Sequence, residues 1–154
     1  MRRSFQRTSQ THANVQDYQM PSSKKQAAPL KHPPKGELKK NWETLCGIAG
    51  QLPDVDIDRS YGTPALKTKG KLIARLRSEA EGGLALRCEL IDREMLMQAD
   101  PEVFYITDHY ANYPMVLVNL AKVRWDAVPE LLVSAWKMAA SKTAIKKFEE
   151  SRHP

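Results

Sequence analysis

The sequence predicts an α+β fold in which helices pack on one face of an antiparallel sheet. Two observations carry this prediction. Apolar residues recur every three or four positions near both ends of residues 41–154, which indicates amphipathic helices. Between these segments, most of residues 57–90 alternate apolar and polar side chains, as half-buried strands do. The resulting order, α-β-β-β-β-α-β-β-α, favours a two-layer sandwich.

The first helix is expected to begin at Asn41, whose side chain can cap it, and to end before Pro53. Its apolar stripe consists of Trp42, Leu45, Ala49 and Leu52. Strands follow near residues 65–68, 71–77 and 84–90. In the last of these, alternation points Leu84, Leu86, Cys88 and Leu90 inward, and Ala85, Arg87 and Glu89 outward.

The second half of the chain predicts two more helices and two more strands. A short helix capped by Asp92 precedes strands at residues 103–107 and 115–120. The clearest helix follows, with Asp126 as its expected cap and Pro129 in its first turn. Its stripe consists of Val128, Leu131, Leu132, Ala135, Trp136 and Ala139. Residues 143–154 either extend this helix or form a separate helical turn.

The positive charge is concentrated at the N-terminus of this 154-residue chain, whose formal net charge is +6. Residues 1–40 carry nine bases and two acids, whereas residues 41–154 carry 15 bases and 16 acids. Residues 1–38 are polar and rich in Pro, so we expect a disordered basic tail ahead of one domain over residues 39–150. Any basic face on that domain must therefore be local.

No apolar run approaches the roughly 18 residues that a transmembrane helix needs. The arginines at the N-terminus are not followed by the apolar segment of a secretory signal. Cys46 and Cys88 are too few for a disulfide framework, so we expect reduced thiols in the core. These features predict a cytoplasmic monomer that does not contact a membrane.

The segment SYGTPALKTKGKLIARLR, residues 60–77, holds five basic residues and no acid. A two-residue turn at Lys69-Gly70 would pair Lys67 with Leu72 and place a lysine among apolar residues. We therefore expect a three-residue turn, Thr68-Lys69-Gly70, which pairs Lys67 with Lys71 and Leu66 with Leu72. In this register Leu66, Leu72, Ala74 and Leu76 face the core, and Ile73 faces outward with the bases.

This register predicts a basic outer face that consists of Lys67, Lys69, Lys71, Arg75, Arg77 and Arg87. Two interpretations remain open. The bases can hold the phosphates of a nucleic acid. Alternatively, they can be the charges with which a sheet edge avoids pairing with another chain.

Several motifs together resemble the MmcQ/YjbR family: YGTPAL (61–66), GKLIARL (70–76), DPEVF (100–104), HYANYPMVLVNL (109–120) and AW (135–136). The resemblance covers about residues 41–143. It implies a CyaY-like or frataxin-like two-layer sandwich with a double-wing arrangement for binding DNA. One wing would be the hairpin around Lys69-Gly70. The other would be the SEAEGG turn, which here carries Glu79 and Glu81. Asn119 stands where the family commonly has an arginine.

A second candidate site combines Tyr61 with His109, Tyr110 and Tyr113 of the segment DHYANYP. Its rings can stack on bases or on a small ligand while His109 binds phosphate. The same aromatic residues can instead cover one end of the core, and we favour that role for Tyr113. This site would suit a small acidic ligand or a protein partner.

The sequence offers no catalytic or metal-binding pattern. Asp54, Asp56 and Asp58 begin like a calcium loop, but Arg59 and Ala65 stand where that loop needs Gly and Glu. Cys88 is expected on the buried face of its strand, where a thiol is usually unreactive. We therefore predict a DNA-binding protein that is not an enzyme and has no cofactor, with the ligand-binding module as the alternative.

Overall fold

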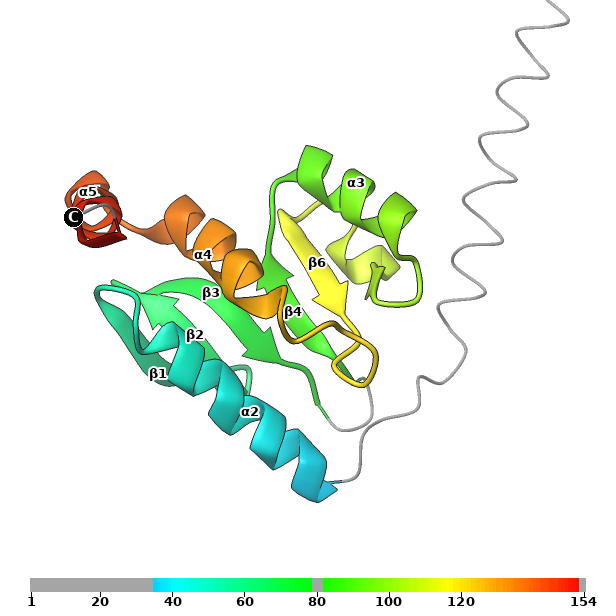
Figure 1. Cartoon of the computed structure of the whole chain (residues 1–154). Coiled ribbons are helices and arrows are strands. Elements are labelled where there is room, and N and C mark those ends of the chain that lie inside the picture. The colour runs from blue at the N-terminus through cyan, green and yellow to red at the C-terminus, as the bar shows by residue number, and fades with distance from the viewer. Residues whose placement is uncertain (1–34, 79–81, 153–154) are drawn as a thin grey trace, which may run out of the picture.

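The computed structural model describes residues 35–78 and 82–152. It contains a six-stranded antiparallel sheet in the order β1-β2-β3-β4-β6-β5. The strands are β1 (Val55–Ser60), β2 (Thr63–Thr68), β3 (Lys71–Leu76), β4 (Leu84–Arg87), β5 (Phe104–Tyr105) and β6 (Met115–Val118). Helices α2 (Lys35–Ala49) and α4 (Val128–Ala139) lie across one face of this sheet (Figure 1). The α+β class is confirmed. Residues 1–34 of the expected basic tail lie outside the described residues, as do Glu79 and Glu81 of the SEAEGG turn. Residues 35–38 of that expected tail are the first residues of α2.

Helix α2 begins at Lys35 and not at Asn41, so the predicted cap is wrong and Asn41 lies inside the helix. Three residues of the expected stripe are confirmed on the helix, since Leu45 and Ala49 are buried in the main core and Trp42 packs against it, whereas Leu52 is buried just beyond the helix end. The helix extends beyond that stripe on its N-terminal side with Lys, Glu and Leu, which favour helix.

Helix α4 carries the stripe that the sequence predicts, with Pro129 in its first turn. The cap is Ala127, whereas Asp126 instead pairs with Arg124 at 3.0 Å. Trp136 is fully buried, and its indole Nε1 donates a hydrogen bond of 3.0 Å to the carbonyl oxygen of Pro53. This bond ties α4 to the turn that follows α2.

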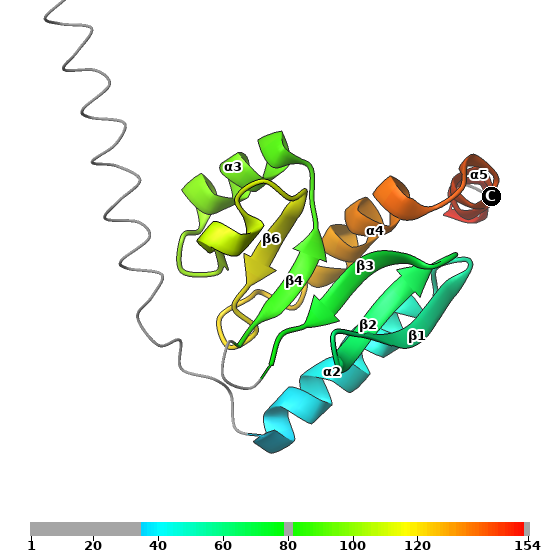
Figure 2. The ribbon, with the colours of Figure 1, turned by 180° about the vertical axis from the view of Figure 1, so that it is seen from behind.

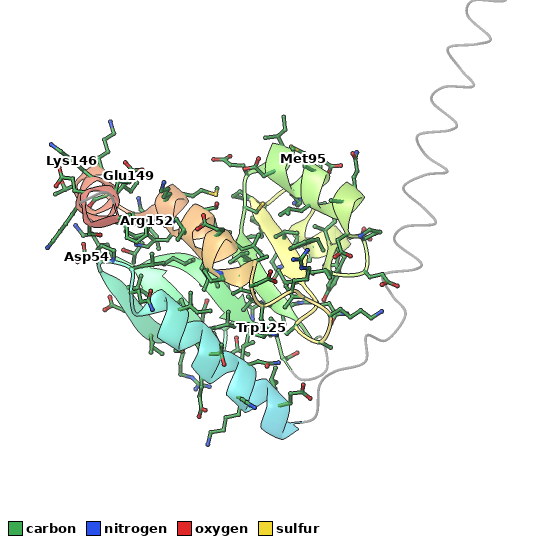
Figure 3. The ribbon with its side chains drawn as sticks, in the orientation of Figure 1. Asp54, Met95, Trp125, Lys146, Glu149 and Arg152 are labelled. Carbon is green, nitrogen blue, oxygen red and sulfur yellow. The ribbon has the colours of Figure 1, made fainter. Side chains whose placement is uncertain are left out.

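A separate helix, α5 (Lys142–Arg152), follows α4. It begins where Ser141 Oγ accepts a hydrogen bond of 3.1 Å from the amide of Ala144, as a capping residue does. The ring of Phe148 packs edge-on against Trp136 with 5.2 Å between centroids. Figure 3 labels Glu149 and Arg152 on α5, and these form ion pairs with Lys137 and Glu130 of α4.

The main core lies between the sheet and the helices, and a smaller cluster occupies the opposite face of the sheet. That smaller cluster consists of Ala85, Tyr105, Tyr110, Met115 and Leu117, with Leu72 at its margin. Figure 2 shows the 3-10 helix η1 (Asp108–Tyr110) and its loop in front of β6 on this face. The same view shows none of the described helices in front of β1, β2 and β3. Part of this sheet face is therefore open.

The β2–β3 hairpin adopts the turn that we rejected from the sequence. Thr68 pairs with Lys71 and Lys67 with Leu72, so Lys69-Gly70 is a two-residue turn. A β-bulge then shifts the register, and Leu66 pairs with Ala74. The predicted three-residue turn and the pairing of Lys67 with Lys71 are both wrong.

The bulge explains why this register is stable. It lets the consecutive residues Ile73 and Ala74 both reach the main core, whereas Leu72 joins the cluster on the opposite face. The predictions that Ile73 faces outward and that Leu72 faces the main core are therefore wrong. Thr68 is buried at 1% exposure and is not a turn residue.

Helix α3 (Leu90–Ala99) connects β4 to the β5–β6 half of the sheet. Its cap is Glu89 and not Asp92, and the Glu89 side chain forms no capping hydrogen bond. Leu90, expected to point inward at the end of a strand, instead begins the helix and is 48% exposed. Strand β4 ends earlier, at Arg87, but the alternation of Leu84, Leu86 and Cys88 into the main core is confirmed.

Candidate nucleic-acid interface

The tip of the β2–β3 hairpin presents two lysines to solvent. Lys69 and Gly70 have φ angles of 50° and 81°, so both turn residues are left-handed, as in a type I′ turn. Lys69 and Lys71 are both exposed. Of the six predicted nucleic-acid contacts, these two are the exposed ones.

Lys67 lies beside acidic residues of β1. Its Nζ atom forms an ion pair of 3.2 Å with Asp58, and Asp56 stands opposite Lys67 in the strand register. A backbone hydrogen bond at Arg59, and then Lys67 itself, lower the pKa of the Asp58 carboxyl. Only 22% of the Lys67 side chain is exposed. Strand β1 therefore neutralises one side of the basic face.

Arg75 links the two candidate sites that the sequence suggested. Its guanidinium donates hydrogen bonds to the Tyr110 hydroxyl at 2.8 Å and to Thr63 Oγ1 at 3.1 Å. The same group lies over the ring of Tyr61, with 5.3 Å to the centroid. The guanidinium of Arg77 lies 5.7 Å from the centroid of the Tyr110 ring. Basic and aromatic residues thus form one surface.

Arg87 is held by the neighbouring strand, because its Nε donates a hydrogen bond of 2.6 Å to the carbonyl oxygen of Leu72. Like Lys67, Arg75 and Arg77, it is half-buried. Four of the six predicted contacts are thus packed on the sheet, and the other two lie at the hairpin turn.

The aromatic loop, residues 108–114, brings His109 against Tyr110 and Tyr113. The centroid of the His109 ring lies 4.9 Å from that of Tyr110 and 5.9 Å from that of Tyr113. Tyr110 is 7% exposed and covers the smaller cluster, whereas Tyr113 is 54% exposed. The covering role that we assigned to Tyr113 therefore belongs to Tyr110. Tyr61 lies in the β1–β2 turn with a φ of 52° and is 90% exposed.

The residue that holds the aromatic loop in place is Arg93 of α3, which the sequence analysis missed. Its side chain is buried at 5% exposure. Its guanidinium donates hydrogen bonds of 2.9 to 3.1 Å to the carbonyl oxygens of Tyr110, Ala111, Tyr113 and Met115. The sequence did contain a signal for its burial. Arg93 precedes Leu96 and Met97 by three and four positions, so it shares their inward helix face.

Two other residues have structural environments. Asn119 is 8% exposed, and its side-chain oxygen accepts a hydrogen bond of 3.0 Å from the amide of Ala121. Cys88 is a free thiol on the buried face of β4, as predicted, and Cys46 is a free thiol that is only partly buried. Burial, together with nearby Asp92, raises the pKa of Cys88 to about 11. A thiol with this pKa is protonated at neutral pH and is a poor nucleophile.

Within residues 35–78 and 82–152, no group of three or more His, Cys, Asp or Glu side chains is arranged to hold a metal ion. In the same part of the chain, no helix has both the length and the apolar character needed to cross a membrane.

A family model described as YjbR matches residues 50–138. The chain belongs to the YjbR family. The matched segment includes the β2–β3 hairpin, the aromatic loop and Arg93, and it excludes residues 1–49 and α5. The family resemblance that the sequence motifs suggested is thereby confirmed.

Two mycobacterial proteins and one solved structure are similar to this YjbR protein. Uncharacterized protein Rv2570 of Mycobacterium tuberculosis and uncharacterized protein Mb2600 of Mycobacterium bovis are each 28% identical over 121 residues. Each alignment covers 70% of this chain and 94% of the relative. The crystal structure of Deinococcus radiodurans protein DR2400, with a DUF419 domain, aligns with a TM-score of 0.57 at 21% identity. It covers 70% of this chain and 87% of that protein, and it supports the fold.

Proposed function

We propose that this YjbR protein binds nucleic acid through the open face of its sheet and the tip of the β2–β3 hairpin. The observation that carries this proposal is the charge of the three strands behind that surface. Strands β2, β3 and β4 contribute Lys67, Lys71, Arg75 and Arg87 and no acidic residue. Asp58 of β1 offsets Lys67, but the surface keeps an excess of basic residues, and phosphate groups are the ligand that such an excess attracts most generally.

The exposed lysines and the exposed rings have different parts in this proposal. Lys69 and Lys71 would contact phosphates, since both side chains are exposed at the turn. The ring of Tyr61 would stack on a base, because it is 90% exposed and lies under the Arg75 guanidinium. Lys67 would contribute less than its position in the sequence suggested, because Asp58 already neutralises it.

Fluorescence anisotropy at low salt, with duplex and single-stranded DNA of one sequence, tests the proposal. We expect a Lys69→Ala/Lys71→Ala variant to bind roughly tenfold more weakly and to lose about two from the slope of log affinity against log salt. The matched control is Lys146→Ala/Lys147→Ala on α5, which removes the same charge and should leave affinity nearly unchanged.

Equal losses in the two double variants would contradict a specific interface on the sheet. A chain that lacks residues 1–34 separates the contribution of the basic N-terminus from that of the sheet. If this deletion alone abolishes binding, the proposed interface is wrong. If the Tyr61 ring stacks on a base, Tyr61→Ala should weaken binding to single-stranded DNA more than binding to duplex DNA.

The second candidate is a binding module for a small anionic ligand at the aromatic loop. It is favoured by the 90% exposure of the Tyr61 ring and by the Arg75 guanidinium, which lies 5.3 Å from the centroid of that ring. His109, Tyr113 and Arg75 would surround the ligand. With adenosine monophosphate as the probe, this candidate predicts thermal stabilisation that His109→Ala abolishes while DNA affinity stays the same.

A binding role, and not a catalytic one, is part of the proposal. Within this proposal Cys88 is a structural thiol, because its pKa of about 11 leaves it protonated at neutral pH. The aromatic loop also uses the Tyr110 hydroxyl as a hydrogen-bond acceptor for Arg75.

A further inference from the structure

A groove of about 480 Å³ lies between α3 and α4, and of the basic-face residues only Arg87 borders it. Its floor is the end of β4, with Leu86 and Cys88. The walls are formed by Met95, Leu96 and Ala99 of α3 and by Leu131, Ser134 and Met138 of α4. Arg87, Glu89 and Asp92 complete the lining. Sites for small molecules usually have volumes of roughly 300 to 1,000 Å³ and walls of this apolar kind.

The groove continues onto exposed apolar surface of α3. Met95, labelled on α3 in Figure 3, is 64% exposed, and Ile91 one turn before it is 74% exposed. Two methionines line the groove, and their unbranched thioether side chains adapt to the shape of an apolar ligand. An apolar body of small-molecule size therefore fits between the helices.

The electrostatics of the groove select the charge of that ligand. Glu89 and Asp92 both raise the pKa of the Cys88 thiol, after the larger effect of burial, so their negative potential reaches the groove floor. The Glu89 carboxylate is not engaged in capping α3. Arg93 opposes this potential at Cys88 more strongly than Glu89 adds to it, but Arg93 is bound to carbonyl oxygens of the aromatic loop and is not part of the groove lining. Arg87 also lines the groove, with its Nε bound to the carbonyl oxygen of Leu72, so the lining carries two carboxylates against one guanidinium.

We propose that this groove binds a small amphipathic cation, such as an aryl or alkyl amine. The apolar body would lie between Met95 of α3 and Met138 of α4, over Leu86. The ammonium group would lie against Asp92 and Glu89. This site shares only Arg87 with the proposed nucleic-acid interface, and its two carboxylates disfavour phosphates there.

Tryptamine is a suitable probe, with indole acetate and tryptophol as anionic and neutral ligands of the same body. Titration of the full chain labelled with nitrogen-15 should shift amide signals of Leu86, Cys88 and Met138. Tryptamine should bind about threefold to fivefold more tightly than tryptophol, as an ion pair near the surface allows. Indole acetate should bind more weakly than either.

Two variants locate the site, and one serves as a control. Asp92→Asn should weaken the binding of tryptamine about threefold and leave the affinity for tryptophol unchanged. Glu94→Gln removes the same charge from the same helix outside the groove and should change neither affinity by as much as twofold. Ala99→Phe places a ring in the groove from an exposed position and should abolish binding without loss of the folded spectrum.

A reactivity measurement gives an independent readout. In a Cys46→Ser background, saturating tryptamine should slow alkylation of Cys88 at least threefold. Several results would overturn the proposal: no shifts at millimolar tryptamine, equal affinity for tryptamine and indole acetate, or binding that survives Ala99→Phe. Shifts confined to Leu90 and Ile91 would also overturn it, because they would indicate a protein-docking surface outside the groove.

Discussion

Among single residues, Arg93 is the buried side chain that holds the backbone of the aromatic loop. Its buried guanidinium holds four carbonyl oxygens of the loop that carries His109 and Tyr113, while Arg75 holds the hydroxyl of Tyr110. The loop is therefore fixed from its backbone and from its central ring. A binding surface made of loop residues needs such support, because an unsupported loop would lose conformational entropy on binding.

Arg93→Met should lower the free energy of unfolding by about 3 kcal/mol or more, because it leaves buried carbonyl oxygens without donors. Urea denaturation measures this loss. Arg93→Lys should recover part of it, since an ammonium group donates but cannot span four carbonyls. In the Arg93→Met variant, amide hydrogen exchange should accelerate much more at residues 108–114 than in β3. Uniform acceleration throughout the sheet would argue against a local fastening role.

A second residue-scale prediction concerns Gly83, which has a φ of 80°. A Cβ atom there would lie 2.6 Å from the Tyr105 hydroxyl and 3.0 Å from the Val118 carbonyl oxygen. Gly83→Ala should therefore cost about 2–4 kcal/mol, from the left-handed backbone and from overpacking. Gly47→Ala is the matched control, because no atom lies within 4 Å and α2 should gain about 0.5–1 kcal/mol. Thermal unfolding compares the two.

Among the elements, the β2–β3 hairpin combines turn geometry, a bulge and charge. Its two-residue turn sets the pairing of Lys67 with Leu72, and the bulge then returns Ile73 and Ala74 to the core. The ion pair with Asp58 makes it possible for Lys67 to lie beside an apolar residue. The register between β2 and β3 is therefore explained only when β1 is considered with them.

Lys69→Asn should raise the free energy of unfolding by about 0.5–1 kcal/mol, because Asn tolerates the left-handed φ of 50° better than Lys does. The same change should weaken DNA binding through the lost charge. Lys71→Asn removes an equal charge from an extended strand position and should bring no such gain. If both variants have the same unfolding midpoint in urea, the strain assigned to Lys69 is wrong.

In the whole molecule, the basic residues of β2 and β3 and the acidic residues at the start of α3 lie on different surfaces. The bases of β2 and β3 lie on the sheet and its hairpin, whereas Glu89 and Asp92 lie at the start of α3 beside an apolar groove. A chain with one surface for phosphates and another for amines can bind two ligands without direct competition. The two proposals can therefore be tested separately on the same protein.

The stability of the whole fold should fall at alkaline pH. The pKa of Cys88 rises from 9.0, the ordinary thiol value, to about 11 in the folded chain. Its contribution is therefore fully present below pH 9 and is lost as the pH rises towards 11, because the unfolded thiol ionises first. The slope due to this one group cannot exceed about 1.4 kcal/mol per pH unit. Urea midpoints between these pH values measure it. Cys88→Ala should flatten the slope, and an unchanged slope would contradict the assignment.

The sequence by itself determined the order of elements, the fold class and the family. It did so because helical stripes such as Leu45–Ala49 and strand alternation such as Leu84–Leu86–Cys88 are local patterns that burial imposes directly on the chain. The sequence also suggested both sets of candidate site residues, since bases and aromatic residues cluster in short segments; their roles stay predictions.

Only the tertiary structure decided which of those residues face solvent. The two-residue turn was rejected because one hairpin was considered without its neighbour, yet Asp58 of β1 stabilises Lys67 in that register. Arg93 was missed because its partners are backbone carbonyls 17 to 22 positions away, and a carbonyl has no signature in sequence. The link between Tyr61 and Tyr110 through Arg75 likewise depends on contacts across the sheet. The spacing of apolar residues along the chain indicates which residues are buried. Contacts between groups far apart in the sequence become known only from the folded structure.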